Sequence, residues 1–271
     1  MVGKLVRMST VRGVAHVHST YSFDGCLNLH DLAGFFQERG IDFVLMSEHV
    51  ETLDTDKINA FISDCKTCSN EKFLLIPGIE IDALNALFFG VQPVNIWAHI
   101  EHLAQQLAAG GALVAVSHPV KVKKSVPQIT ASMVEGVEVW NSRHDGKLAI
   151  NNRIVRFWLE LRKSLGRPLV PLCGIDFHNR DDFVPLVFEL TCERLDQAEI
   201  MAAIRAGRHR IVHSNKPVPL DFTSGELAPL YRMRSLLYRS VYEAVYGVHR
   251  AVRRVGLKAP TGLRRLLRRV F

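Results

Sequence analysis

Strand-like apolar runs alternate with helical patterns through most of this 271-residue sequence. The strand-like runs occur at 14–18, 42–47, 73–76, 79–81, 86–91, 112–117, 136–140, 169–172, 184–191 and 210–212. Helical patterns occur at 28–39, 55–69, 95–109, 146–165 and 197–205. Buried strands separated by helices are typical of a parallel α/β fold. About seven such units in roughly 210 residues favour a barrel over an open dinucleotide-binding sheet, and the sequence has no G-x-G-x-x-G or P-loop motif.

The composition is that of a globular protein with a buried core, since 48% of the residues are apolar and 23% are charged. No apolar run approaches the roughly 18 residues of a membrane-spanning helix, and residues 1–12 lack the apolar segment of a secretion signal. The cysteines are too scattered for a disulfide framework: Cys26, Cys65, Cys68, Cys173 and Cys192. We therefore expect a cytoplasmic protein.

The net charge of +7 is unevenly distributed. Residues 231–271 contain eleven Lys and Arg against one acid, Glu243, whereas residues 1–230 carry a net charge of −3. The segment 214–230 is marked by Lys216-Pro217-Val218-Pro219 and Pro229. We therefore expect a main domain at 1–213, a proline-containing linker or strap at 214–230, and a basic amphipathic helical tail at 231–271.

Side chains that can bind a metal follow the ends of successive predicted strands. In chain order they are His16, His18, Asp24, His49, Glu80, His118, His144, Asp176 and His178. Alternate residues of a strand point the same way, so His16 and His18 can reach one metal ion. The carboxyl ends of parallel strands gather at one face of a fold, and three metals that share a bridging carboxylate would use all nine residues. For any single histidine, a buried hydrogen-bonded side chain is the alternative interpretation.

Most of these residues lie in short motifs: His16-Val17-His18-Ser19-Thr20, Asp24-Gly25, Glu48-His49, Pro77-Gly78-Ile79-Glu80, Ser117-His118-Pro119, Glu138-Val139-Trp140-Asn141, His144 and Gly174-Ile175-Asp176-Phe177-His178. By the type and order of these motifs, the sequence from about Val14 to His213 resembles the PHP (polymerase and histidinol phosphatase) family of metal-dependent phosphoesterases. The resemblance implies a distorted (β/α)7 TIM-like barrel with two or three divalent metal ions, which are zinc, manganese or iron.

The resemblance also implies a ligand set. It places His16, His18, Glu80 and Asp176 on a first metal, Asp24, His49 and His178 on a second, and His118 and His144 on a third, with Glu80 as the bridge. One position departs from the family pattern, because Glu48 stands where the family more often has Asp before the histidine. The longer side chain affects the hydrogen bond expected of this acid, and it leaves the ligand set unchanged.

Imidazole and carboxylate donors suit Zn, Mn or Fe, and two adjacent cations generate hydroxide from a bridging water. We expect that hydroxide to attack the phosphorus atom of a phosphate ester. Arg143 would grip a non-bridging oxygen, and a metal-bound water or His178 would protonate the leaving group, with Asp176 as the third catalytic residue. A phosphorylated small molecule, a phosphomonoester, is the expected substrate. The alternatives are a nucleotide or oligonucleotide phosphoesterase, including a 5′–3′ exonuclease, and a non-catalytic metal-binding module.

The basic tail contains a helical seam of apolar residues: Leu237, Val241, Ala244, Val248, Ala251 and Val255. Beyond Pro260, residues 262–271 form a second short amphipathic pattern with arginines on its polar side. The tail has three competing interpretations. It covers an apolar patch of its own barrel or of a second copy, it lies peripherally on the anionic inner membrane surface, or it binds nucleic acid. The large apolar face makes nucleic acid the weakest of the three partners.

Overall fold

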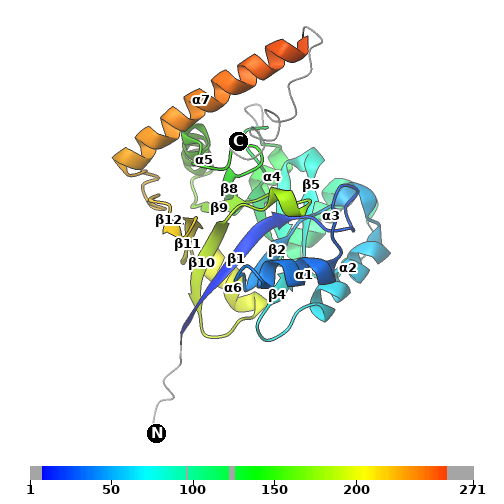
Figure 1. Ribbon diagram of the computed structural model, residues 1–271. Coiled ribbons are helices and arrows are strands. Elements are labelled where there is room, and N and C mark those ends of the chain that lie inside the picture. Colours follow the sequence, from blue (N-terminus) through cyan, green and yellow to red (C-terminus); the bar gives the residue numbers. More distant parts are fainter. Residues whose placement is uncertain (1–7, 96, 122–125, 255–271) are drawn as a thin grey trace.

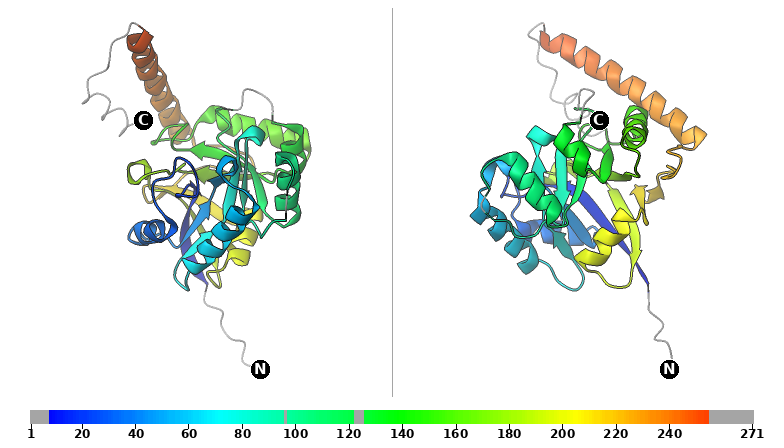
Figure 2. Two further views of the ribbon diagram at one scale, coloured as in Figure 1. Left: turned by 90° about the vertical axis from the view of Figure 1, so that its right-hand side faces the viewer. Right: turned by 180° about the vertical axis from the view of Figure 1, so that it is seen from behind.

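The computed structural model describes residues 8–95, 97–121 and 126–254, and it contains two six-stranded sheets with helices around them (Figures 1 and 2). The strand order is β12-β11-β10-β1-β2-β4 in one sheet and β3-β5-β6-β7-β8-β9 in the other. The fold is therefore of the mixed α/β class, as the alternating sequence pattern predicted.

The strands are β1 (Ser9–Val17), β2 (Phe43–Met46), β3 (Glu48–His49), β4 (Leu74–Ile76), β5 (Gly78–Ile81), β6 (Ala86–Phe89), β7 (Leu113–Val116), β8 (Gly136–Asn141), β9 (Val170–Gly174), β10 (Leu186–Cys192), β11 (His209–His213) and β12 (Lys216–Pro217). The helices are α1 (Leu29–Gln37), α2 (Thr55–Thr67), α3 (Ile100–Ala109), α4 (Gln128–Met133), α5 (Asn152–Leu165), α6 (Gln197–Arg205) and α7 (Pro229–Arg254). Three single-turn 3₁₀ helices lie at Val50–Thr52, Asp82–Leu84 and Arg180–Asp182.

The two sheets meet along β1. Single residues separate β2 from β3 and β4 from β5, so these strands lead from one sheet into the other. Strand β1 of the first sheet is also hydrogen-bonded, through its backbone, to the chain that follows β9 of the second sheet. Ile175 N donates to Ala15 O at 2.9 Å, Phe177 N to His16 O at 3.0 Å, and His18 N to Phe177 O at 2.9 Å. The ends of β1, β3, β5 and β9 are thereby brought close to one another.

The expectation of a parallel arrangement holds for part of the sheets and is wrong for the rest. The pairs β1–β2, β2–β4, β3–β5, β7–β8 and β8–β9 are parallel. Strand β6 is antiparallel to both β5 and β7, and β10 is antiparallel to β1 and β11. The physical reason at β6 is the short connection, because the 3₁₀ turn Asp82–Leu84 and the left-handed Asn85 reverse the chain directly.

Helices α1, α2, α3, α5 and α6 each bury one apolar side. In α1 the buried residues include Leu32, Phe35 and Phe36, and Asn28 caps the helix by accepting from Asp31 N at 2.8 Å, as expected. Two helices begin later than predicted. Helix α3 begins at Ile100, capped by His99, and α5 begins at Asn152, capped by Asn151. Helix α4 was not predicted.

The chain after β11 forms a short strand and a long helix. Strand β12 lies inside the segment expected to be a linker and pairs with β11. Helix α7 begins at Pro229, a residue type that suits the first turn of a helix. It lies next to α5 at the edge of the molecule (Figures 1 and 2). The short helix predicted at 262–271 lies outside the described residues. No helix within the described residues has the length and apolar character needed to cross a bilayer.

Candidate metal centre

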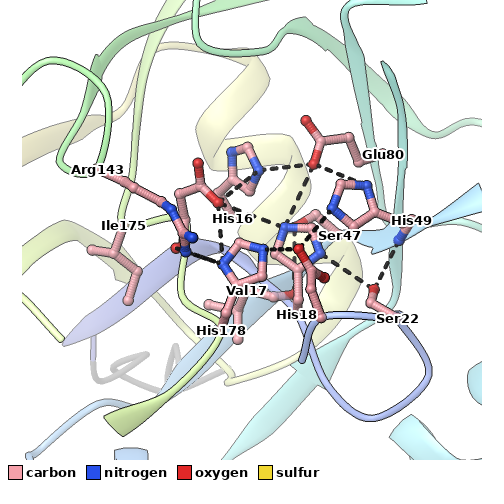
Figure 3. A network of polar contacts seen from close by, with 12 residues as sticks. His16, Val17, His18, Ser22, Ser47, His49, Glu80, Arg143, Ile175 and His178 are labelled. Carbon is pink, nitrogen blue, oxygen red and sulfur yellow. Dashed lines mark hydrogen bonds and ion pairs between the residues drawn. The ribbon is translucent and has the colours of Figure 1, made fainter. Parts of the chain in front are cut away.

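All nine residues predicted as metal ligands lie in one cluster at the strand ends. Figure 3 shows His16, His18, His49, Glu80 and His178 from this cluster. They form overlapping groups in which the potential ligand atoms are within 4.8 Å of one another: His18, Asp24, His49 and His178; His16, His18 and Asp176; His16, Glu80 and His118; His118, His144 and Asp176. Seven of the nine are buried, and Asp24 and His144 are half-buried. The fold thus joins residues that are up to 162 positions apart.

His16 enters the cluster through an irregularity of β1. The register with β2 shifts between Ala15 and Val17, and His16 has a φ of 62°. A bulge of this kind re-aims a side chain that regular alternation would point elsewhere. His16 and His18 do converge, with ring centroids 5.3 Å apart, as expected from the sequence. The bulge at His16, which the sequence did not reveal, is part of how they do so.

Backbone strain is concentrated in the cluster. His118 and Asp176 also have positive φ values, of 21° and 50°. Such values are unfavourable for residues other than glycine, and they persist where surrounding contacts hold them and where function requires them. Three of the six non-glycine residues with positive φ in the described part of the chain are therefore candidate ligands.

Glu80 lies close to four histidines of the cluster, and Figure 3 shows it beside His16, His18 and His49. Its carboxylate oxygens are 2.8 Å from His118 Nε2, 3.1 Å from His16 Nε2, 3.5 Å from His18 Nε2 and 3.6 Å from His49 Nδ1. One carboxylate therefore faces four imidazoles that come from three strand ends. This is the position expected of a bridging ligand.

Two further groups of contacts complete the cluster, and they are linked by His178 Nδ1, which lies 3.4 Å from Asp176 Oδ1. In one group, Asp24 Oδ2 is 2.9 Å from His178 Nε2 and 3.6 Å from His49 Nε2. In the other, His144 Nε2 is 2.9 Å from Asp176 Oδ2, and its ring packs edge-on against His118. His144 lies on a loop held by Asn141, whose side-chain oxygen accepts from His144 N at 3.1 Å. The structure thus brings all predicted positions together.

Glu138 is a buried member of the site that the sequence interpretation left without a role. Its carboxylate lies 2.9 Å from His16 Nδ1, and it accepts from His118 N at 2.6 Å and from Asn141 Nδ2 at 3.0 Å. Glycine at 174 makes room for it, because a Cβ there would lie 1.8 Å from Glu138 Oε1. An acid inside the apolar strand β8 was the available signal, since a charge is rarely buried without partners.

Glu48, where the sequence departs from the family pattern, supports the chain around His18 and His49. It accepts from Ser19 N at 2.9 Å and from Ser22 Oγ at 2.5 Å, and Ser22 Oγ in turn accepts from His49 N at 2.9 Å. Burial raises the pKa of Glu48 to about 7, although these hydrogen bonds favour its charged form. The longer acid therefore has a complete set of partners.

Asp82 is a second residue that the sequence interpretation missed. It forms a metal-capable group with His49 and Glu80, and its Oδ2 lies 3.9 Å from His49 Nδ1. Its side chain is 53% exposed, unlike those of the buried ligands. Its place directly after β5, two residues beyond Glu80, was the available signal.

The electrostatics of the cluster favour a cation among the carboxylates. Burial disfavours the charged form of His16, but the surrounding carboxylates, Glu138 first, outweigh burial and raise the pKa well above its usual value. Burial likewise works against ionised Glu80 and Asp176, yet the charge on His16 holds the pKa of both carboxyls well below the ordinary range. The buried acids thus remain anionic only beside positive charge.

The donor atoms fit divalent metals. Burial and the charge of His16 lower the pKa of His18 well below its usual value, which keeps the ring neutral as a ligand must be. Its fully buried Nε2 has no hydrogen-bond partner within the described residues, and it faces Glu80 at 3.5 Å and Asp176 at 3.9 Å. Metal–ligand bonds of about 2.0–2.2 Å place neighbouring ligand atoms at roughly such separations.

Arg143 lies beside the cluster and is 44% exposed. Its Nη1 is 2.6 Å from His178 Nδ1 and 3.5 Å from Asp182 Oδ2. The same Nδ1 lies 3.0 Å from the backbone oxygen of Asp176, so it accepts from Arg143 in one tautomer of the ring and donates to Asp176 O in the other. Lys121 also lies near the cluster. Burial is the main cause of the lowered pKa of His144, and the charge of Lys121 lowers it further, whereas Asp176 raises it.

The comparisons with known proteins concern the fold. No protein-family model matches the sequence, and neither does any curated protein. Among solved structures, the chain is similar to a two-domain protein from Bacteroides vulgatus that contains a predicted PHP-like metal-dependent phosphoesterase. The TM-score is 0.57 at 16% identity, over 76% of this chain and 65% of that one. The chain thus spans slightly less than two thirds of that protein.

Two further structures give lower scores. One is a protein from Bifidobacterium adolescentis that is described, by inference, as a metal-dependent phosphoesterase. Its TM-score is 0.44 at 12% identity, over 62% of this chain and 88% of that one. The other is the lesion-specific endonuclease PfuEndoQ from Pyrococcus furiosus, with a TM-score of 0.49 and 14% identity over 85% and 66%. The similarity to the Bacteroides protein confirms, at the level of fold, the PHP resemblance that the sequence motifs carry.

Proposed function

We propose that this chain is a metal-dependent phosphoesterase that hydrolyses a small phosphomonoester at a centre of two or three divalent metal ions. One observation carries the proposal. Nine metal-capable side chains, from several strand ends and the loops that follow them, gather in one largely buried cluster that includes the carboxylate of Glu80. A structural role for so many buried histidines and acids would require partners for every polar atom, yet His18 Nε2 and Asp24 Oδ1 lack hydrogen bonds within the described residues.

The proposed ligand set is the one that the PHP resemblance implies, and the overlapping groups of metal-capable side chains support it in part. A first metal would be held by His16, His18, Glu80 and Asp176, a second by Asp24, His49 and His178, and a third by His118 and His144 with Glu80 as the bridge. Mixed imidazole and carboxylate donors suit Zn, Mn or Fe. When bound, such metals lower the pKa of a coordinated water and neutralise charge that develops on a phosphoryl group.

Arg143 supplies the proposed contact to the substrate. Its half-exposed guanidinium can donate two parallel N–H groups to a non-bridging phosphate oxygen pair. In the tautomer with its proton on Nε2, His178 accepts from Arg143 at Nδ1, and that tautomer suits a donor to the leaving oxygen. As a metal ligand through Nε2, His178 would have its proton on Nδ1, where Asp176 O at 3.0 Å accepts it and Arg143 no longer donates. A phosphate oxygen competes for Arg143 and so favours this change.

The same proposal includes the distorted (β/α)7 TIM-like barrel. Its support is the set of hydrogen bonds between β1 and the chain after β9, together with the passage of β2 into β3 and β4 into β5. Around such a barrel the strand ends would all face the cluster.

A small substrate is favoured over a nucleic acid by charge. Residues 1–230, which supply the whole cluster, carry a net charge of −3, and an extended polyanion is held by rows of basic side chains. Oligonucleotide hydrolysis is therefore an outcome for the experiment to test, and so is metal binding without catalysis.

The test is metal analysis of the purified full chain with hydrolysis of an aryl phosphate, a bis-aryl phosphate and a 5′-phosphorylated oligonucleotide, before and after chelation. We expect two or three metals per chain and chelator-sensitive turnover, with the monoester preferred at least tenfold. His118→Ala should abolish turnover, whereas His102→Ala, a control on helix α3, should not. A preparation that stays inactive when Zn, Mn or Fe is restored would overturn the enzymatic proposal, and faster oligonucleotide cleavage would overturn the substrate class.

A further inference from the structure

Helix α7 is attached to the rest of the chain by one polar side. Ser235 Oγ donates to Ile150 O and accepts from Asn152 Nδ2 at 3.2 Å. Lys147 N donates to Tyr238 Oη at 3.2 Å, and Glu243 forms an ion pair with Arg153 at 3.2 Å. These contacts join α7 to α5 and to the loop before it, and the helix extends past them along the edge of the molecule (Figures 1 and 2).

The other side of α7 carries large apolar side chains exposed to solvent. Exposed fractions are 54–78% for Leu230, Met233, Leu236, Leu237, Val241 and Val248. These make up six of the ten exposed large apolar side chains in the part of the chain that the structure describes. Five of them, all but Leu236, follow the spacings of three, four and seven residues that mark one helix face. We call these five the apolar stripe: Leu230, Met233, Leu237, Val241 and Val248.

The outward direction of this stripe excludes one of the three interpretations of the tail, namely that it covers an apolar patch of its own barrel. The seam at 237, 241 and 248 does not cover an apolar patch of its own barrel, because Ser235 and Tyr238 occupy the side that faces the body. A face this apolar on a protein surface marks an interaction site. The remaining question is which partner the stripe fits.

The charges around the stripe favour an anionic lipid surface. Arg232 and Arg234 are exposed near the start of α7, and residues 231–271 carry a net charge of +10. The single acid in that segment, Glu243, is already paired with Arg153 and Arg239. A second copy would bring an equally positive helix against this one. Nucleic acid would be attracted to the arginines and would leave five aliphatic side chains in water.

We propose that α7 is a membrane-surface helix that lies parallel to an anionic bilayer, with the apolar stripe at the boundary of the acyl chains and its arginines at the lipid headgroups. An amphipathic helix with a basic polar side binds in this way without crossing the bilayer. The body-facing contacts of Ser235 and Glu243 remain in place, so binding needs no unfolding of α7 from α5. The proposal does not depend on the reaction at the metal centre.

The test is co-sedimentation of the full chain with vesicles of phosphatidylglycerol and phosphatidylcholine, compared with vesicles of phosphatidylcholine alone. We expect binding to the anionic vesicles that weakens as salt is raised. Leu237→Glu combined with Val241→Glu should lower the partition coefficient at least tenfold. Met8→Glu, a control at an exposed apolar residue directly before β1, should change it less than twofold. Both positions of the double variant are exposed, so thermal unfolding should match that of the parent.

Three results would overturn the proposal. The first is no binding of the parent chain to anionic vesicles. The second is equal binding of the double variant and the parent. The third is a stable dimer in sedimentation velocity that the double variant dissociates, with no vesicle binding by either, since the stripe would then be an interface between two copies. Arg232→Ser combined with Arg234→Ser provides a second variant, which should lose affinity and part of the salt dependence.

Discussion

His16 and Glu138 are joined by a 2.9 Å contact between Nδ1 and Oε1, although 122 residues separate them in the chain. The other nitrogen of His16 lies 3.1 Å from Glu80 in the cluster. One ring nitrogen is thus held by a buried carboxylate while the other faces the candidate ligands. Carboxylate support of this kind fixes the orientation and raises the basicity of a ligating histidine.

Replacing Glu138 should therefore weaken metal binding without removing a proposed ligand. We expect Glu138→Gln to reduce metal affinity by about 10–100-fold, because the amide keeps the shape and loses the charge that faces His16. Competition with a chromogenic chelator measures the change. Glu135→Gln is the matched control, since Glu135 precedes β8 and pairs with Arg205 instead. Equal affinities for the two variants would contradict the role given to Glu138.

Substitutions of Asp176 and Asp82 should have very different effects on metal affinity and turnover. Asp176 is buried and contacts both His144 and His16, so Asp176→Asn should lower metal affinity and turnover by at least about 100-fold. Asp82 is half-exposed and 3.9 Å from His49, so Asp82→Asn should cost less than about fivefold, as for a solvated ion pair. Metal content and steady-state kinetics of both variants test this. A larger effect at Asp82 would place a ligand there.

A side chain at Gly146 should lower the free energy of unfolding, because Tyr238 of helix α7 packs against this glycine. It has a φ of 96°, and a Cβ on it would lie 2.5 Å from the Tyr238 hydroxyl. Gly166 has a φ of 63° with open space around it, so Gly166→Ala isolates the backbone cost of about 1–2 kcal/mol. We expect Gly146→Ala to cost a further 1–3 kcal/mol, approximately, from overpacking. Urea unfolding measures both, and adding Tyr238→Ala should recover most of the difference.

His209 should make stability depend on pH. It is buried, and burial lowers its pKa to about 4 although it contacts Pro171 O at 2.9 Å. The unfolded chain, with a histidine pKa of about 6.5, binds more protons between pH 6.5 and 4. Unfolding free energy is therefore fully retained above about pH 6.5 and is lost as pH falls toward 4.

From pH 7.5 to pH 5, the contribution of His209 to this loss is about 2 kcal/mol. His209→Gln removes the titrating group and keeps a donor for Pro171 O. The loss measured by urea unfolding at the two pH values should therefore be smaller in the variant by about that amount. Equal losses in the parent and the variant would rule out His209 as the source. Other buried groups titrate equally in both proteins and cancel in the comparison.

The sequence was sufficient for the local features of this protein. Apolar runs and caps located most strands and helices, because hydrophobic periodicity and the cap at Asn28 act over a few residues. It was also sufficient for the composition of the site. Histidines and acids placed after successive strands were recognisable as one set, since the strand ends of such folds gather at one face.

Tertiary structure decided what depends on contacts between distant residues. The bulge at His16 is defined by pairing with β2, and Glu138 has its role because β8 lies beside the ends of β1 and β7. The apolar seam of α7 was visible in the sequence, yet its outward direction follows from the contacts of Ser235 and Tyr238 with the loop before α5. Periodicity defines a helix face, and only packing shows whether that face is buried or left to meet a partner.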